Sequence, residues 1–271
     1  MSGWRLQLRR APALRVDLRG ITPLALAGLA VAQIEQLPVG HGNTRLPLGE
    51  FFSVAADSGE ALVIEGDLAR FDRVGWQMAG GQLRVEGNVG HYAGGCMSAG
   101  ELRVSGHAGA LAGCEMAGGT LAIAGNAGDF AASTLPGSID GMRGGTLIVN
   151  GNAGDRLADR MRRGTVLVFG NVGDFLASRL VAGTIAVGGT AGAQAGYGMR
   201  RGSVVFAAGP DAVALSPTFL PAGAEAAVFW QLLARDLARH GGPFASLPHR
   251  RIERHLGDRG TGGKGELIVV R

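Results

Sequence analysis

MRGGTLIVNGNAGD, residues 142–155, is followed closely by MRRGTVLVFGNVGD, residues 161–174. The two segments start nineteen positions apart and are identical at nine of their fourteen positions. Self-similarity at a fixed spacing is the signature of repeat proteins, in which each unit stacks on its neighbours. This pair of segments therefore decides the architecture, because it determines which residues become neighbours in space.

The repeat extends over most of the chain. All its steps are nineteen positions long except one of twenty-six, and the extra residues fall in AASTLPGSIDG, residues 131–141, where Pro136 and Gly137 indicate an inserted loop. A weaker copy, GEALVIEGD at residues 59–67, precedes the series, so we predict about eight coils. The first residue of the repeat, which we call the anchor position, is occupied by Met78, Met97, Met116, Met142, Met161, Leu180 and Met199.

Each unit alternates apolar and other residues and then ends in a turn. The pattern is x-Leu-x-Val/Ile followed in most units by Gly-Asn-x-Gly, which predicts a short strand entering a tight turn. No unit leaves room for a helix between its turns. The sequence therefore predicts an all-β fold, a right-handed parallel β-helix with a 19-residue repeat, in which equivalent residues stack about 4.8 Å apart.

Composition agrees with a solenoid rich in turns. The 271 residues include 48 glycines, and 6% of the chain is aromatic. The longest apolar stretch, residues 23–37, is too short to span a bilayer, and no secretory leader is recognisable, so we expect a cytoplasmic protein. Cys96 and Cys114 lack the spacing of a metal site and are expected to be buried free thiols.

The pattern divides the chain into three parts. We expect an N-terminal capping segment over residues 1–56, a parallel β-helix with GXGXG-type repeats over residues 57–209, and a C-terminal helix and tail over residues 210–271. The helix is predicted over residues 222–239 and is expected to cover the unpaired edge of the last coil. Its predicted buried face consists of Phe229, Leu232, Leu233 and Leu237.

Several columns of equivalent residues have structural interpretations. The methionines of the anchor position are predicted to lie in the core. Gly125, Gly151 and Gly170 are expected to permit tight turns, through a positive φ or close approach of the backbone. The asparagine column is expected to form a ladder of amide hydrogen bonds between coils, with asparagine tolerating a left-handed backbone. Its members are Asn88, Asn126, Asn152 and Asn171, with His107 and Thr190 as replacements.

Charged columns carry the candidate binding residues. Stacked like charges repel by roughly 1 kcal/mol per pair even in water, so each row needs counter-charge. An aspartate row, Asp129, Asp155 and Asp174, either neutralises the arginines or lies in solvent with them. Alternatively, the arginines bind an acidic subunit face or a polyanionic ligand, in keeping with the net charge of +4. These candidate site residues are Arg143, Arg162, Arg163, Arg200 and Arg201.

Catalytic patterns are missing from the sequence. The six histidines show no HxH or HExxH spacing, and the chain has no GxSxG elbow and no strand–GxGxxG–helix unit. We therefore assign no catalytic residue and no metal ligand. Nucleic acid is not expected as a partner, because no aromatic residues interleave the arginines.

The regular coils, the segment LPLGEFFSV at residues 46–54 and the terminal GDRGTGGKGEL at residues 257–267 together resemble the C subunit of formylmethanofuran dehydrogenase. This family has a GXGXG-type β-helix that is similar to the C-terminal domain of glutamate synthase. It occurs in archaeal tungsten or molybdenum complexes and in the bacterial formyltransferase/hydrolase complex of methylotrophs. The chain has a single lysine, Lys264, among 26 basic residues, a bias typical of GC-rich bacterial genomes, which favours the bacterial complex.

The resemblance implies a non-catalytic structural subunit in a hetero-oligomer for one-carbon metabolism. Such a complex transfers a formyl group from formyl-tetrahydromethanopterin to methylofuran and hydrolyses it to formate, with zinc in a partner subunit. Methylofuran carries a polyglutamate tail, which gives the arginine columns a candidate ligand. The alternatives are the C subunit of a tungsten or molybdenum formylmethanofuran dehydrogenase, and a stand-alone ligand-binding β-helix or glutamate-synthase-like GXGXG domain.

Overall fold

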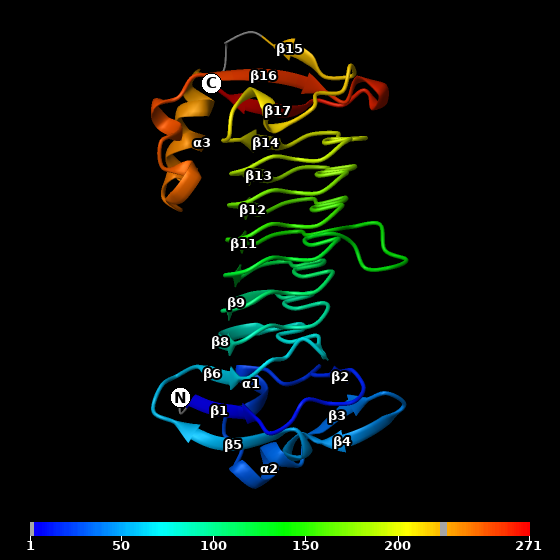
Figure 1. The fold of residues 1–271 in the computed structure, drawn as a ribbon, viewed down its shortest axis with the longest axis vertical. Coiled ribbons are helices and arrows are strands. Elements are labelled where there is room, and N and C mark those ends of the chain that lie inside the picture. Colours follow the sequence, from blue (N-terminus) through cyan, green and yellow to red (C-terminus); the bar gives the residue numbers. More distant parts are fainter. Residues whose placement is uncertain (1–2, 223–226) are drawn as a thin grey trace.

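The computed structural model describes residues 3–222 and 227–271. Within these residues, one 13-stranded sheet runs the length of the molecule, and its centre is a series of parallel strands stacked in chain order (Figure 1). The parallel strands are β6 (Leu62–Glu65), β8 (Ala79–Glu86), β9 (Ala99–Val104), β10 (Thr120–Ile123), β11 (Thr146–Val149), β12 (Thr165–Val168), β13 (Thr184–Val187) and β14 (Ser203–Phe206).

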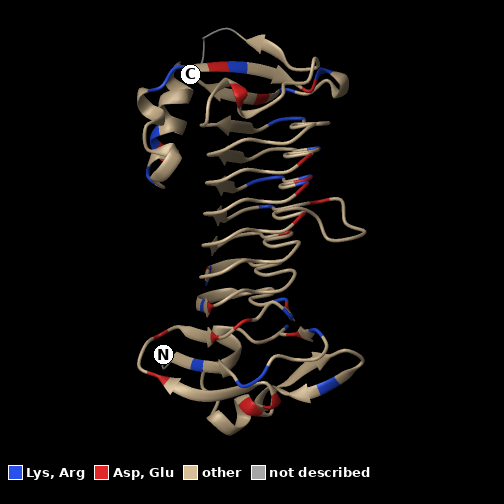
Figure 2. Ribbon diagram, viewed as in Figure 1, with Lys and Arg blue, Asp and Glu red and all other residues tan. Residues whose placement is uncertain are grey.

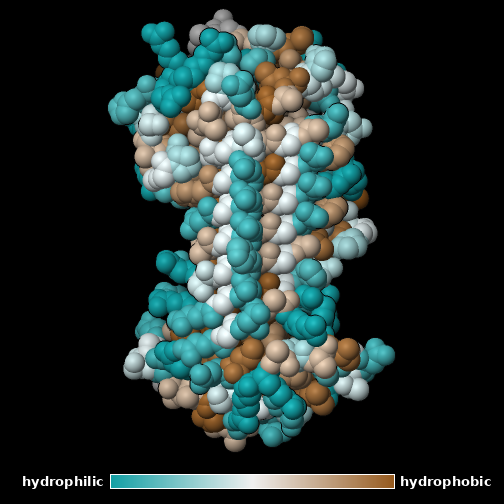
Figure 3. Space-filling model, in the orientation of Figure 1, coloured by the Kyte–Doolittle hydropathy of each residue, from teal (hydrophilic) through white to brown (hydrophobic). Residues whose placement is uncertain are grey.

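Equivalent residues of successive repeats are paired. Leu121 lies opposite Leu147, and Leu147 lies opposite Val166, so the strands keep the register that the repeat predicts. A second line of parallel bridges joins the coils at a separate point, for example from Ala127 to Ala153. Figure 3 shows the resulting columns as straight stripes between two wider ends. The predicted mostly-β fold with a long parallel sheet is confirmed.

The interior of the coils is filled by the alternating strand residues and by the anchor position. Leu147 and Val149 of β11 are both fully buried. Every residue of the anchor column, from Met78 to Met199, also has no exposed surface, which confirms the predicted place of the methionines in the core. Because equivalent side chains stack along the axis, the anchor column forms a continuous part of the apolar core.

The asparagine column forms the predicted ladder of amide hydrogen bonds between coils, but without the left-handed backbone. Asn152 Oδ1 accepts a hydrogen bond from the Asn171 N–H at 2.8 Å, and Asn126 Oδ1 accepts one from the Asn152 N–H at the same distance. The asparagine side chains therefore bond to the backbone of the next coil, and at the end of the column the Thr190 hydroxyl also donates to Asn171 Oδ1 at 3.2 Å. Among the described residues, these asparagines also lack the positive φ that was expected of them. The left-handed conformation occurs elsewhere in the coil, for example at Arg156 and Ala158.

The N-terminal end closes the first coil with strands. β1 (Gly3–Leu8) pairs in parallel with β6 and antiparallel with β5 (Phe52–Asp57). Two short helices lie in this end, α1 (Pro23–Leu26) and α2 (Val31–Glu35). A separate four-stranded sheet comprises β4 (Thr44–Pro47), β3 (Pro38–His41), β2 (Val16–Asp17) and β7 (Phe71–Asp72).

The C-terminal end is also closed by strands, which corrects the prediction that a helix covers the last coil. β17 (Gly265–Val270) pairs in parallel with β14, followed by β16 (Ile252–Gly257) and β15 (Leu220–Ala222) in antiparallel order. A strand satisfies the N–H and C=O groups of an open edge, whereas the backbone groups of a helix, apart from those at its two ends, are already bonded within the helix.

The helix α3 (Ala227–Ala238) lies instead against the outer face of the sheet (Figure 1). Its buried residues are Trp230, Ala234 and Leu237, which pack with Leu167, Ala186 and Val205 of the sheet. Of the predicted buried face, Leu237 is buried and Leu233 is half-buried. The prediction is wrong for Phe229 and Leu232, which are 44% and 63% exposed.

Short 3₁₀ helices complete the secondary structure of the described residues. They are η1 (Leu48–Glu50), η2 (Pro210–Ala212), η3 (Gly242–Phe244), η4 (Leu247–His249) and η5 (Arg259–Thr261). The last of them belongs to the tail segment that carries the GDRGTGGKGEL motif.

The turn glycines are predicted to be irreplaceable because of close approach between coils. Gly151 does not have a left-handed φ, but a Cβ added there would lie 2.8 Å from the carbonyl oxygen of Gly125. We expect Gly151→Ala to lower the free energy of unfolding by about 1–3 kcal/mol, measured by urea denaturation. Gly59→Ala is the control, because the nearest atom to its Cβ would be 3.9 Å away. Equal stability of the two variants would contradict the close-approach explanation.

Candidate functional site

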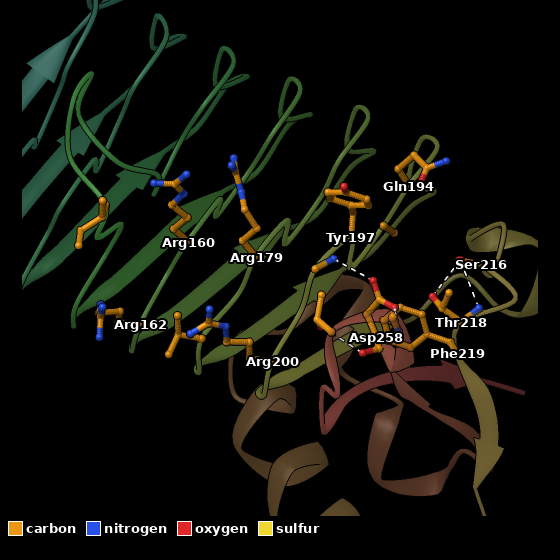
Figure 4. Close-up of a pocket in the computed structure, with 16 residues that line it drawn as sticks. Arg160, Arg162, Arg179, Gln194, Tyr197, Arg200, Ser216, Thr218, Phe219 and Asp258 are labelled. Carbon is orange, nitrogen blue, oxygen red and sulfur yellow. Dashed lines mark hydrogen bonds between the residues drawn. The ribbon is translucent and has the colours of Figure 1, made fainter.

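A groove of about 830 Å³ lies between the C-terminal coils and the tail (Figure 4). One wall consists of coil residues, the second of tail residues such as Thr218 and Asp258, and the inserted loop contributes Ile139. Four arginines line it: Arg160, Arg162, Arg179 and Arg200. Figure 2 shows charged residues along this edge of the C-terminal coils, whereas the coils before them carry few.

The four arginines come from two columns on either side of the anchor position. Arg160 and Arg179 directly precede the anchor on consecutive coils. Arg162 and Arg200 directly follow it and lie two coils apart, with Val181 between them. Since the anchor side chains point into the core, the two arginine columns flank a strip of backbone at the surface. Figure 4 shows the side chains spread along this strip.

The structure brings together part of the predicted site. Arg162 and Arg200 line the groove, whereas Arg143, Arg163 and Arg201 do not. Arg160 and Arg179 line the groove although they were not among the predicted site residues. Their position in a column one residue before the anchor was visible in the repeat. The contribution of the tail to the groove could not be seen in the sequence, because no repeat relates the tail to the coils.

The aspartate row does not neutralise the arginines. Asp129 Oδ1 accepts a hydrogen bond from the Asp155 N–H at 2.9 Å, and Asp155 Oδ1 accepts one from the Asp174 N–H at 2.8 Å. The row is thus a second ladder from side chain to backbone, and it corrects the interpretation that the two charged rows pair with each other. Backbone N–H groups supply the partial positive charge that this row needs.

Other acids partner some of the groove arginines. Arg179 makes a two-pronged contact with Asp159, whose carboxylate is buried, with oxygens 2.8 Å from Nη2. Arg162 Nε lies 2.5 Å from Asp140 Oδ1 in the inserted loop. The Arg200 side chain has no hydrogen bond or ion pair with any described residue. Arg200 is therefore the groove arginine with its full donor capacity available to a ligand.

Asp258 joins the tail to the last coil at the far end of the groove. Its carboxylate is buried and accepts hydrogen bonds from the Gly198 N–H at 3.0 Å and the Gly260 N–H at 2.8 Å. Burial raises the pKa of Asp258, but hydrogen bonds from Gly198, Gly260 and Thr218 outweigh it and hold the pKa below its ordinary value. The carboxylate thus fixes the wall that the tail contributes.

The described part of the chain contains neither a metal-binding cluster nor a membrane-spanning helix. Residues 3–222 and 227–271 contain no cluster of three or more His, Cys, Asp or Glu placed to hold a metal ion. Within the same residues, no helix has the length and apolarity that crossing a bilayer requires. The two cysteines are unbridged, and burial raises the pKa of Cys114 to about 12, so it stays a protonated thiol at neutral pH.

Comparison with known proteins relates this repeat β-protein to subunits of enzyme complexes. No family model matches the chain. It is 48% identical over 85 residues to the C subunit of the formyltransferase/hydrolase complex Fhc of Methylorubrum extorquens, covering 31% of this chain and 32% of the relative. It is 33% identical over 99 residues to the C subunit of tungsten-containing formylmethanofuran dehydrogenase 2 of Methanothermobacter wolfeii, covering 35% and 37%. The matched segments thus span about a third of these curated relatives.

A solved structure matches over nearly the whole chain. It is the crystal structure of the formyltransferase/hydrolase complex (FhcABCD) from Methylorubrum extorquens in complex with methylofuran. One of its chains is 44% identical, with a TM-score of 0.90 and 98% of both chains covered. The chain therefore belongs to the family of C subunits of the formyltransferase/hydrolase complex, to which the C subunits of formylmethanofuran dehydrogenase are related. The resemblance inferred from the sequence is confirmed.

The lowered pKa of Asp258 predicts a pH-dependent contribution to stability. A carboxyl whose pKa is depressed on folding stabilises the protein above its unfolded pKa, and this stabilisation is lost as pH falls through the folded pKa. We expect Asp258→Asn to be less stable than wild type at pH 7, with the difference shrinking below about pH 4. Urea unfolding across pH 3–7 measures this, with Asp211→Asn, an exposed site, as the control. A difference that is independent of pH would count against the role given to the carboxylate.

Proposed function

We propose that the chain is a non-catalytic structural subunit of a cytoplasmic formyltransferase/hydrolase complex. The observation that carries the proposal is the match over 98% of both chains to a chain of the FhcABCD structure. The proposed assembly passes a formyl group from formyl-tetrahydromethanopterin to methylofuran and releases it as formate. In this proposal zinc and the catalytic residues belong to partner subunits, and this chain holds those subunits together.

The proposal includes the architecture of the scaffold. We describe the stack as a right-handed parallel β-helix of about eight coils, with a capping segment over residues 1–56, coils over 57–209 and a C-terminal part over 210–271. The two lines of parallel pairing support it, because each coil meets its neighbours at two separate points. The right hand follows from the strong preference of crossovers between parallel strands.

The groove is proposed to bind the polyglutamate tail of methylofuran. Guanidinium groups bind carboxylates through paired, charge-assisted hydrogen bonds, and stacked coils repeat such a group about every 4.8 Å. Arg160 and Arg179 lie on consecutive coils, and Arg200 has no partner among the described side chains. A flexible chain of carboxylates lying along the coils meets one arginine after another. The related structure, in complex with methylofuran, supports this choice of ligand.

The arginines that lie outside the groove have a different proposed role, which is supported by a separate observation. Arg163 and Arg201 are exposed and have no side-chain hydrogen bond or ion pair with the described residues. They lie outside the groove lining, so a small ligand bound to them would remain exposed to solvent. We therefore assign these two arginines to the acidic face of a neighbouring subunit, whose larger surface would exclude water around them.

Arg200 and Arg201 provide a matched test of the two assignments. In the complex purified after co-expression of its subunits, we expect Arg200→Ala to assemble normally and to slow formyl transfer about tenfold at low methylofuran. The defect should disappear at saturating methylofuran, because only binding is weakened. We expect Arg201→Ala to leave transfer by the intact complex unchanged and to release a subunit at lower salt than wild type does.

The outcomes separate the parts of the proposal. Wild-type chain that elutes alone, despite the presence of the other subunits, would contradict the scaffold function. Unchanged transfer by Arg200→Ala at low methylofuran would remove the groove as the carrier site while leaving the scaffold function intact. Loss of assembly in Arg200→Ala would show that the groove contacts a subunit instead.

A further inference from the structure

The helix α3 is apolar on more of its circumference than the sheet covers. Trp230, Ala234 and Leu237 face the sheet and are at most 4% exposed. On the opposite side, Val228 is 75% exposed and Leu232 is 63% exposed. A helix that is apolar on both sides is expected to be buried on both sides. Single exposed apolar residues are ordinary, but adjacent ones on one short helix mark an interaction surface.

The exposed side of α3 changes from apolar to basic along the helix. Helical spacing places Val228, Leu232 and Arg235 along one side, at i, i+4 and i+7, and Arg239 follows in the turn directly after the helix. Phe229, which is 44% exposed, borders the first turn of this side. We call the surface of Val228, Phe229, Leu232, Arg235 and Arg239 the outer face of α3. It begins with a cluster of large apolar side chains and ends with two arginines.

Positive charge dominates the surroundings of the outer face. Residues 227–251 contain four arginines and one acid, Asp236. Asp236 pairs with Arg239 at 3.6 Å, but both side chains are mostly exposed, so the pair neutralises little. The Arg235 side chain has no hydrogen bond or ion pair with the described residues. A complementary surface therefore has an apolar centre and carboxylates on one side.

The helix is held rigidly enough to present this face. Trp230 Nε1 donates a hydrogen bond to the Arg250 carbonyl oxygen at 3.3 Å, and the ring is buried in the cluster that joins α3 to the sheet. Phe244 and Leu247, from the 3₁₀ helices that follow, are fully buried in the same cluster. A helix fixed in this way loses little conformational entropy when a partner binds its other side.

We propose that the outer face of α3 docks onto an acidic, partly apolar surface of another subunit of the complex. The inference rests on the proposed scaffold function and names a surface for it that is separate from the arginine groove. A second copy of this chain fits poorly, because a contact between two outer faces would bring the arginines of both copies into one interface, and the outer face itself contains no carboxylate to pair with them. A membrane also fits poorly, because the larger apolar side of α3 faces the sheet and the exposed strip is narrow.

The test compares exposed variants in the co-expressed complex. Val228→Ser with Leu232→Ser removes the apolar cluster, and Arg235→Glu with Arg239→Glu reverses the charge. Both sets of residues are exposed, so we expect unchanged unfolding transitions. We expect each double variant to raise the protein concentration needed for assembly at least about tenfold, measured by analytical size exclusion on dilution. Leu14→Ser and Arg10→Glu, exposed residues at the N-terminal end, are matched controls expected to assemble like wild type.

Each result that differs from these expectations overturns a specific part of the docking proposal. Normal assembly of Val228→Ser with Leu232→Ser overturns the docking surface, and normal assembly of the charge-reversed variant overturns the acidic character of the partner. Isolated wild-type dimers that the serine variant dissociates would assign the face to a second copy. Binding to phosphatidylserine vesicles that is lost in this variant, with assembly intact, would assign it to a membrane. Wild-type chain that never joins the other subunits overturns the scaffold function and this inference together.

Discussion

The structure depends on the requirement that each coil satisfies the backbone N–H groups of the next. Along the strands, carbonyl oxygens of the neighbouring coil accept these hydrogen bonds, as where the Phe169 N–H donates to the Val149 carbonyl oxygen at 2.9 Å. At the turns no strand partner is present, and the carboxamide of Asn152 or the carboxylate of Asp155 takes that role. A shift of one residue would misplace both side-chain acceptors and turn the apolar strand residues outward. The constant spacing of the repeat is therefore preserved: residues 131–133 stay buried in the stack, and the additional residues, 134–140, leave it as a loop.

The repeating part of the fold could be predicted because its causes are local. Alternating apolar residues define the strand, glycines define where coils approach closely, and constant spacing defines which residues stack. The hydrogen bonds within the columns were harder to anticipate. A column of asparagines or aspartates is equally compatible with bonds between side chains and with bonds to the backbone. Only the conformation of the turn, in which the N–H of Asn171 points toward Asn152, decides between them.

The ends and the groove escaped prediction for a different reason. They depend on contacts between segments that no repeat relates. Gly198 and Asp258 are 60 residues apart in the chain, yet their hydrogen bond fixes one end of the groove. The amphipathic pattern of α3 was recognised, but its buried side was misassigned because both sides carry large apolar residues. Burial of Trp230 against β12 and β13 determined the side that faces the sheet, and the sequence of the helix alone contains no such preference.

The inserted loop, which leaves the stack at residues 134–140, has a consequence for how the protein family can vary. A loop of arbitrary length disturbs no ladder, since both of its ends remain on the coils that flank it. A change in the stack itself is tolerated only in whole repeats, because the gain or loss of part of a repeat breaks the columns. Each repeat gained or lost would move the two ends of the molecule apart or together by about 4.8 Å. The number of coils thus acts as a molecular ruler, graduated in discrete steps, that sets how far apart the two ends of the molecule stand.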